Sequence, residues 1–332
     1  MAEAPPHPRD VYQLLGHEGP QAAFEAARER GRLHHAWLLT GGEGLGKASF
    51  AYRAARRLLG APQADAFGPL GSDPTHPVSR QVAARSHPDL LVIERAGDDG
   101  KLRKVIPVDE ARKLSEFFSK SPASAPHRVA IVDAADDLNS NSANALLKTL
   151  EEPPPSGVLL LVAHSPGRLL ATIRSRCRRL TFAPLEEDIV AGFVAHRAGV
   201  NTEEAIRLAR MSGGAPGRAW NLAAAGAIGV DDAARALLMG LPQVDDTLAQ
   251  GLADRFRGGE GAAQFSLLFE LLAERVHADL TAKAGAGQGG LDRWAQAWET
   301  LQRLPREVEA VNLDRADAFF TALASLRLAA RP

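Results

Sequence analysis

A glycine-rich segment that ends in lysine, Gly41–Ala48 (GGEGLGKA), has the residue types of a phosphate-binding loop. It follows an apolar run that predicts a strand and precedes a predicted amphipathic helix that reaches about Leu59. In this context, backbone N–H donors and the helix N-terminus can cradle phosphate groups. The glycines and lysine fit the G-x-x-x-x-G-K pattern. The candidate phosphate-binding residues are Gly41, Gly44, Gly46 and Lys47.

The position after the lysine departs from this pattern. A serine or threonine hydroxyl there normally helps to hold Mg²⁺, but this chain has Ala48. Ser49 comes one residue late, and a shift of one residue turns a helical side chain by about 100°. The sequence therefore predicts a loop that holds phosphate but has lost a metal ligand.

A second informative stretch is Asn144–Cys177 (NALLKTLEEPPPSGVLLLVAHSPGRLLATIRSRC). It begins as a helix that the prolines Pro153–Pro155 stop, because proline has no N–H to continue the helix. The apolar run Val158–Ala163 lacks alternation, which predicts a strand buried on both faces of a parallel sheet. The stretch closes on Ser175-Arg176-Cys177 within a cluster of arginines.

With these motifs, residues Val11–Leu185 resemble bacterial clamp-loader subunits of the AAA+ class, in particular the delta-prime subunits. In that family the Ser-Arg-Cys triplet carries an arginine finger, so the resemblance implies this role for Arg176. A planar, permanently charged guanidinium can meet two phosphate oxygens of ATP bound by a neighbouring subunit. The competing interpretation of the arginine cluster is a solvated face or a general contact for phosphate backbones.

The resemblance also locates further parts of an ATPase site. Asp133, at the end of the apolar stretch Arg128–Asp136, matches the Mg²⁺-holding acid, but Ala134 stands where the general base is expected. His164 stands where active relatives sense the γ-phosphate, and Gly217 where they place another sensing arginine. The lost metal ligand and base together predict a module that does not hydrolyse ATP by itself.

Composition limits the remaining possibilities. The chain has 332 residues, of which 45% are hydrophobic and 24% charged, as in an ordinary globular protein. Its single cysteine excludes internal disulfides and multi-cysteine zinc sites, so no zinc is expected. The net charge of −1 argues against coating nucleic acid by electrostatics alone. Without a signal peptide or a membrane-length apolar run, we expect a cytoplasmic protein.

The expected fold is an α/β AAA+ P-loop domain with a parallel sheet over residues 1–183. A small helical lid over 184–228 and an all-helical C-terminal collar for oligomerisation over 229–332 should follow. Within the collar, helices are predicted over Leu291–Leu304 and Val308–Ala330, and a flexible linker over Lys283–Gly290.

Three smaller features carry local predictions. Asp136 and Asp137 are interpreted as N-terminal caps of the following helix. His34 and His35 should point to opposite faces of a strand and orient its entry by hydrogen bonding. Residues Asp98–Gly100 are typical of a hairpin tip.

The predicted function is that of a non-hydrolysing clamp-loader subunit. Its expected partners are gamma/tau-type and delta-type subunits, with the sliding clamp and primed DNA reached through the complex. No cofactor is required for this role, and the sequence leaves open whether ATP or ADP occupies the loop. The first alternative is a gamma/tau-type motor ATPase, which Lys47 and Asp133 favour. The second is a nucleic-acid-binding module that uses Arg174–Arg179.

Overall fold

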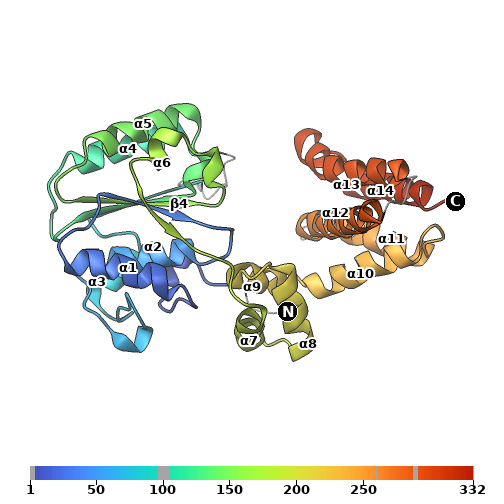
Figure 1. Ribbon diagram of the computed structural model, residues 1–332, viewed down its shortest axis with the longest axis horizontal. Coiled ribbons are helices and arrows are strands. Elements are labelled where there is room, and N and C mark those ends of the chain that lie inside the picture. Colours follow the sequence, from blue (N-terminus) through green and yellow to red (C-terminus); the bar gives the residue numbers. More distant parts are fainter. Residues whose placement is uncertain (1–3, 96–104, 259–260, 287–290, 332) are drawn as a thin grey trace. The chain divides into compact units, whose positions relative to one another are not determined.

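The computed structural model describes residues 4–95, 105–258, 261–286 and 291–331 (Figure 1). The predicted hairpin tip at Asp98–Gly100 lies outside these residues. The chain divides into two compact units. We call residues 4–197 and 209–220 the sheet unit, and the described residues of 198–208 and 221–332 the helical unit.

A five-stranded parallel sheet forms the centre of the sheet unit. Its strands are β1 (Ala36–Thr40), β2 (Leu90–Glu94), β3 (Arg128–Asp133), β4 (Gly157–Ala163) and β5 (Arg178–Thr181). Their order in the sheet is β2-β3-β4-β1-β5, and all pairs are parallel. Strand β4 is buried at every position, which confirms the prediction made from its uninterrupted apolar run.

Helices cover both faces of this sheet, as Figure 1 shows. On one face lie α1 (Glu18–Glu29), α2 (Lys47–Leu58) and α3 (Pro77–Ala83), and on the other α4 (Val108–Phe118), α5 (Ser140–Glu151) and α6 (Ala171–Arg174). Successive residues of β4 pack into the apolar cores on opposite faces of the sheet, because side chains alternate along a strand. Leu160 packs with Phe24 and Phe50 of the first layer, whereas Leu161 packs with Leu146 of the second.

Short turns of 3₁₀ helix connect several of these elements. They are η1 (Pro8–Asp10), η2 (Asp65–Phe67), η3 (Ala135–Asp137) and η4 (Pro166–Arg168). Three helices then follow the sheet: α7 (Glu187–Ala198), α8 (Thr202–Met211) and α9 (Pro216–Ala224). The boundary between the two compact units passes through α8. The predicted boundaries of the lid, at residues 184 and 228, therefore stay a prediction.

The helical unit contains five further helices. They are α10 (Ala227–Met239), α11 (Asp246–Phe256), α12 (Gly261–Gly285), α13 (Asp292–Val311) and α14 (Arg315–Ala329). The predicted break between residues 304 and 308 is wrong, because α13 continues through Pro305. Leu301, Leu304 and Val308 are buried on one side of this helix, and their packing outweighs the loss of one backbone hydrogen bond.

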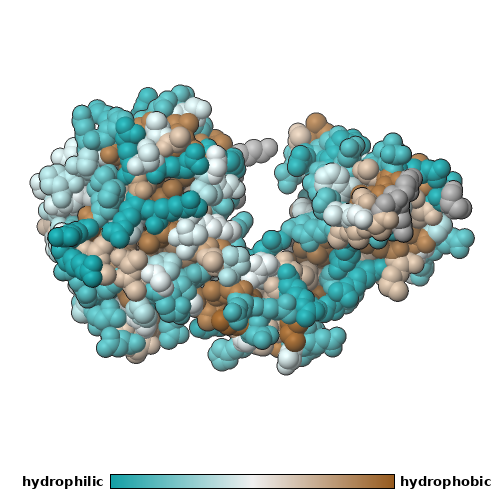
Figure 2. Space-filling model, in the orientation of Figure 1, coloured by the Kyte–Doolittle hydropathy of each residue, from teal (hydrophilic) through white to brown (hydrophobic). Residues whose placement is uncertain are grey.

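The predicted linker Lys283–Gly290 is also partly wrong. Helix α12 reaches Gly285, so Lys283 is helical; it forms an ion pair with Asp279 at 2.6 Å and lies 5.7 Å above the Trp294 ring. Residues 287–290 lie outside the described part of the chain. On the surface, hydrophilic side chains predominate and apolar ones are interspersed (Figure 2). Among the described residues, we find no helix long and apolar enough to cross a membrane.

Candidate phosphate-binding loop and an exposed arginine

The predicted phosphate-binding loop connects β1 to α2 at the carboxyl edge of the sheet. Gly41, Gly44 and Gly46 have φ angles of 145°, 77° and 85°, a region that side chains rarely tolerate. A Cβ on Gly44 would also lie 2.5 Å from the backbone nitrogen of Arg218. These glycines therefore fix the curved backbone that a phosphate cradle requires.

Lys47 is the first residue of α2 and is only 2% exposed. Its ammonium group donates to the carbonyl oxygens of Gly41 at 2.7 Å and Gly42 at 2.5 Å, and lies 3.0 Å from Nδ1 of His164. Burial lowers the pKa of Lys47 to about 8, although the nearby Asp133 partly opposes this shift. The lysine is thus placed where a P-loop lysine meets phosphate, but it is directed at its own loop.

Asp133 ends β3 on the same edge of the sheet. Burial, and then the charge of Glu94 on the neighbouring strand, raises the pKa of Asp133 to about 6. The next residue, Ala134, is buried at 4% exposure and offers no carboxylate, and Ala48 packs against the apolar core. The glycine-rich backbone therefore has the shape of a phosphate cradle, while two of the groups that would hold Mg²⁺ and activate water are replaced by methyl groups.

The capping role predicted for Asp136 and Asp137 is wrong. Asn139 caps α5, with its side chain accepting from the backbone N–H of Ser142 at 2.9 Å. Asp136 instead accepts from the backbone nitrogens of His164, at 3.1 Å, and Ser165, at 2.7 Å. The reason is the turn η3, which lies between β3 and the helix and directs this carboxylate toward the end of β4.

Helix α9 closes the loop from another direction. The backbone N–H of Gly217 donates to the carbonyl oxygen of Gly44 at 2.9 Å. Gly217 thus lies against the loop, at the position where the resemblance expects a sensing arginine. Glycine has no side chain that could reach a phosphate. At this position the chain therefore contacts the glycine-rich loop only through the backbone of Gly217.

Arg176 lies between α6 and β5, at the amino edge of the sheet. Its side chain is 38% exposed, forms an ion pair with Glu151 at 3.0 Å and donates to the carbonyl oxygen of Thr172 at 3.1 Å. At about 3.3 Å per strand residue, the length of the strands separates Arg176 from the phosphate-binding loop by roughly 15 Å. Arg176 is therefore accessible to another molecule and far from the loop of its own chain.

The other arginines of this cluster behave differently. Arg178 lies 4.8 Å from the centre of the Trp37 ring, and Arg179 donates through Nε to the hydroxyl of Thr40 at 3.0 Å. Both side chains are thereby engaged with β1, the neighbouring strand. The arginine cluster is not a uniform basic face.

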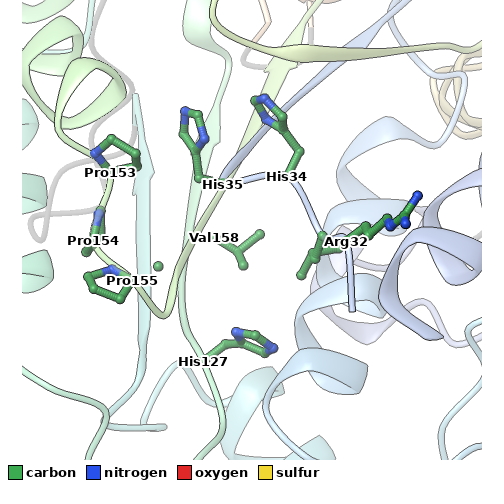
Figure 3. A pocket seen from close by; sticks show the side chains of 10 residues that line it. Arg32, His34, His35, His127, Pro153, Pro154, Pro155 and Val158 are labelled. Carbon is green, nitrogen blue, oxygen red and sulfur yellow. The ribbon is translucent and has the colours of Figure 1, made fainter. Parts of the chain in front are cut away.

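A cavity of about 410 Å³ also opens at the amino edge of the sheet, lined by His34, His35, His127 and Pro153–Pro155 (Figure 3). The rings of His34 and His35 stack at 4.3 Å, so their predicted placement on opposite faces is wrong, because both residues precede β1. The predicted orienting hydrogen bond is confirmed for His34, whose Nδ1 lies 2.8 Å from the carbonyl oxygen and 3.1 Å from the backbone nitrogen of Ala36. Among the described residues, no group of histidine, cysteine and acidic side chains could hold a metal ion.

Sequence reasoning did not identify Asp136 or Glu151 as parts of these sites. Asp136 carried a weak signal, an acid just beyond a buried strand, but its partners His164 and Ser165 follow a different strand. Glu151 stands next to the prolines that end α5 and had no signal at all. The partners of both depend on which strands lie side by side.

A parallel sheet covered on both faces by helices, with a glycine-rich loop and lysine after β1, defines an α/β protein of the P-loop type. The family model described as "DNA polymerase III, delta subunit" matches residues 16–186. The chain is 32% identical to DNA polymerase III subunit delta' of Escherichia coli (strain K12), over 77% of this chain and 69% of that protein. It therefore belongs to the delta-prime family of DNA polymerase III clamp-loader subunits.

Other relatives match shorter regions. The delta' subunit of Pseudomonas aeruginosa is 38% identical to this chain. The aligned region covers 47% of this chain and only 45% of that protein. A Mycobacterium tuberculosis gamma/tau subunit is 30% identical over 63% of this chain and 36% of its own length. Among solved structures, a Thermotoga maritima gamma subunit-related protein is similar over 92% of this chain and 99% of that one, with a TM-score of 0.49 and 20% identity.

Proposed function

We propose that this protein is a non-hydrolysing subunit of a bacterial clamp loader that donates Arg176 to ATP bound by a neighbouring subunit. The observation that carries the proposal is the position of Arg176, exposed at the edge of the sheet opposite the phosphate-binding loop. A guanidinium at that place can act on phosphate only in another chain. Membership of the delta-prime family supports the assignment.

The proposed partners are gamma/tau-type and delta-type subunits. A gamma/tau subunit of DNA polymerase III is among the similar proteins, and a delta-type partner is what membership of the delta-prime family implies. The sliding clamp and primed DNA would be reached through the assembled complex. The subunit requires no nucleotide of its own for this role, because Arg176 acts on the neighbour's ATP. The chain's own loop would at most hold nucleotide without cleaving it, since Ala48 and Ala134 lack the required oxygen atoms.

The test replaces Arg176 by alanine in the reconstituted clamp loader and measures ATP hydrolysis stimulated by DNA. An arginine finger contributes about a thousandfold or more at the site it serves. We therefore expect ATP hydrolysis at that site to become undetectable. The total hydrolysis rate of the complex should fall by the fraction that this site contributes. Arg174→Ala is the matched control, because Arg174 is exposed in the same cluster and is expected to leave hydrolysis unchanged. If Arg176→Ala assembles normally and hydrolyses ATP at the unchanged rate, the finger assignment is wrong.

The rival function is a motor subunit that hydrolyses its own ATP. The similarity to gamma/tau subunits, together with Lys47 in the phosphate-binding loop, favours this alternative. Ala48, Ala134 and Gly217 count against it. Hydrolysis by the isolated chain separates the two functions.

A further inference from the structure

The ammonium group of Lys47 has all of its hydrogen-bonding capacity used within the protein. A protonated lysine carries three N–H donors and no acceptor. Its nitrogen lies within hydrogen-bond distance of three groups: the carbonyl oxygens of Gly41 and Gly42, at 2.7 and 2.5 Å, and Nδ1 of His164, at 3.0 Å. With the side chain 2% exposed, a phosphate oxygen can reach this nitrogen only by replacing one of the three.

His164 is the one side chain among these three partners, and it is held in place through its backbone. Its N–H donates to Asp136 at 3.1 Å, and the N–H of Ser165 donates to the same carboxylate at 2.7 Å. Asp136 is itself buried, at 7% exposure. Because a protonated lysine has no lone pair, Nδ1 of His164 must accept, which assigns the ring as neutral with its hydrogen on Nε2.

The surroundings of Lys47 favour this closed arrangement over a bound anion. Besides the effect of Lys47 on His164, the charges that act on these two residues are those of Glu43, Asp133, Asp136 and Asp137. All four are acidic, so they stabilise the ammonium where it lies and repel phosphate. Gly217 adds a second closing contact through its bond to the Gly44 carbonyl, at 2.9 Å.

We propose that His164 is an affinity-determining residue of the phosphate-binding loop: it occupies Lys47 and so competes with the phosphates of a nucleotide. Binding of a nucleotide requires Lys47 to exchange the imidazole nitrogen for a phosphate oxygen. The loop is therefore kept in a self-occupied state by one side chain from the adjacent strand. This inference concerns the chain's own loop and is independent of the role of Arg176.

The experiment measures binding of ADP to the isolated full-length chain by titration calorimetry. Hydrogen bonds to charged groups contribute enough that His164→Leu, which removes the acceptor, should bind ADP about tenfold to a hundredfold more tightly than the native chain. His164→Asn is the matched variant, because Oδ1 of asparagine offers an acceptor at the position of Nδ1. We expect its affinity to stay within about threefold of the native value.

Lys47→Ala, introduced alone and together with His164→Leu, tests whether the effect passes through the lysine. We expect the gain in affinity to vanish in the double variant. Circular dichroism and the thermal midpoint verify folding, and His164→Ala replaces His164→Leu if the leucine is not accommodated. Inorganic pyrophosphate, titrated in parallel, isolates the phosphate contribution from that of the nucleoside.

Three results would overturn the proposal. The first is an unchanged or weaker affinity of His164→Leu, and the second is a gain in affinity that survives Lys47→Ala. The third is the absence of ADP binding in all variants, since the loop would then be closed by something other than His164. None of these results bears on hydrolysis at a neighbouring subunit, so failure here and failure of the proposed function are distinguishable.

Discussion

Asp133 is a carboxyl group whose environment favours its protonated form. Burial and the charge of Glu94 raise its pKa to about 6, from 3.8 for an unperturbed aspartate. The ionised form is therefore less favourable in the folded chain than in the unfolded chain. The free energy of unfolding should therefore fall as the pH rises from about 4 to about 6. Above that range the contribution of Asp133 should stay constant.

Asp133→Asn should remove this loss. We expect the free energy of unfolding at pH 7.5 to rise by about 1 to 2 kcal/mol, because the neutral amide does not carry the cost of burying an ionised carboxylate next to Glu94. Urea denaturation between pH 3.5 and 8 measures this. Asp109→Asn is the control, because the Asp109 side chain is 81% exposed and should leave stability almost unchanged. An Asp133→Asn variant that is less stable than the native chain at pH 7.5 would contradict the argument.

Cys177, the residue next to Arg176, is predicted to be unreactive. Burial raises the pKa of its thiol to about 12, and the side chain packs against the apolar core under α5 and α6. Only the thiolate reacts rapidly, so at pH 8 the native chain should react with a disulfide reagent at least about a hundredfold more slowly than the chain in urea. Because this is the only cysteine, the absorbance change reports on it alone. Rapid reaction of the native protein would show that the segment opens.

At the scale of elements, one buried acid joins three helices of the helical unit. Asp231 of α10 is 1% exposed and forms ion pairs with Arg207 of α8, at 2.5 Å, and with Arg275 of α12. Burial by itself would raise the pKa of Asp231, but the hydrogen bonds from the two arginines lower it below the ordinary value. The ionised carboxylate therefore stabilises the folded chain above pH 4, and this contribution is lost as the pH falls through the lowered pKa.

Asp231→Asn should destabilise the chain by about 3 kcal/mol at pH 7, because it removes the buried carboxylate that Arg207 and Arg275 both contact. Urea denaturation followed by circular dichroism measures the change. The adjacent Asp232 also pairs with Arg207 but is 59% exposed, so Asp232→Asn should cost about 0.5 kcal/mol. Equal effects of the two substitutions would show that burial does not govern the strength of these pairs.

Element boundaries were predictable wherever a local pattern was strong. The apolar run of β4 and the amphipathic pattern of α2 correctly predicted the observed elements, since side-chain periodicity is set by the backbone itself. Prediction failed at Pro305, where packing of the flanking leucines keeps α13 continuous. It also failed at Asp136, where a 3₁₀ turn redirects the carboxylate. Both failures arise where contacts distant in sequence outweigh a local preference.

At the scale of the whole molecule, the isolated chain should hydrolyse ATP no faster than a blank. Without a hydroxyl at position 48 and a carboxylate at 134, the loss should amount to several orders of magnitude relative to an active relative. Phosphate release is measured with and without primed DNA, and Lys47→Ala should give the same baseline. Turnover that this substitution abolishes would instead identify a motor subunit.

The sequence by itself determined the glycine-rich loop after β1, the alanines at positions 48 and 134, the two-sided burial of β4 and the relationship to the delta-prime family. These are properties of residue types and of local spacing. Only the tertiary structure decided that His164 bonds to Lys47 and that Glu151 pairs with Arg176. The physical reason is the strand order: β4 pairs with β1, and this places the residue after β4 beside the loop after β1, 117 positions away in the chain.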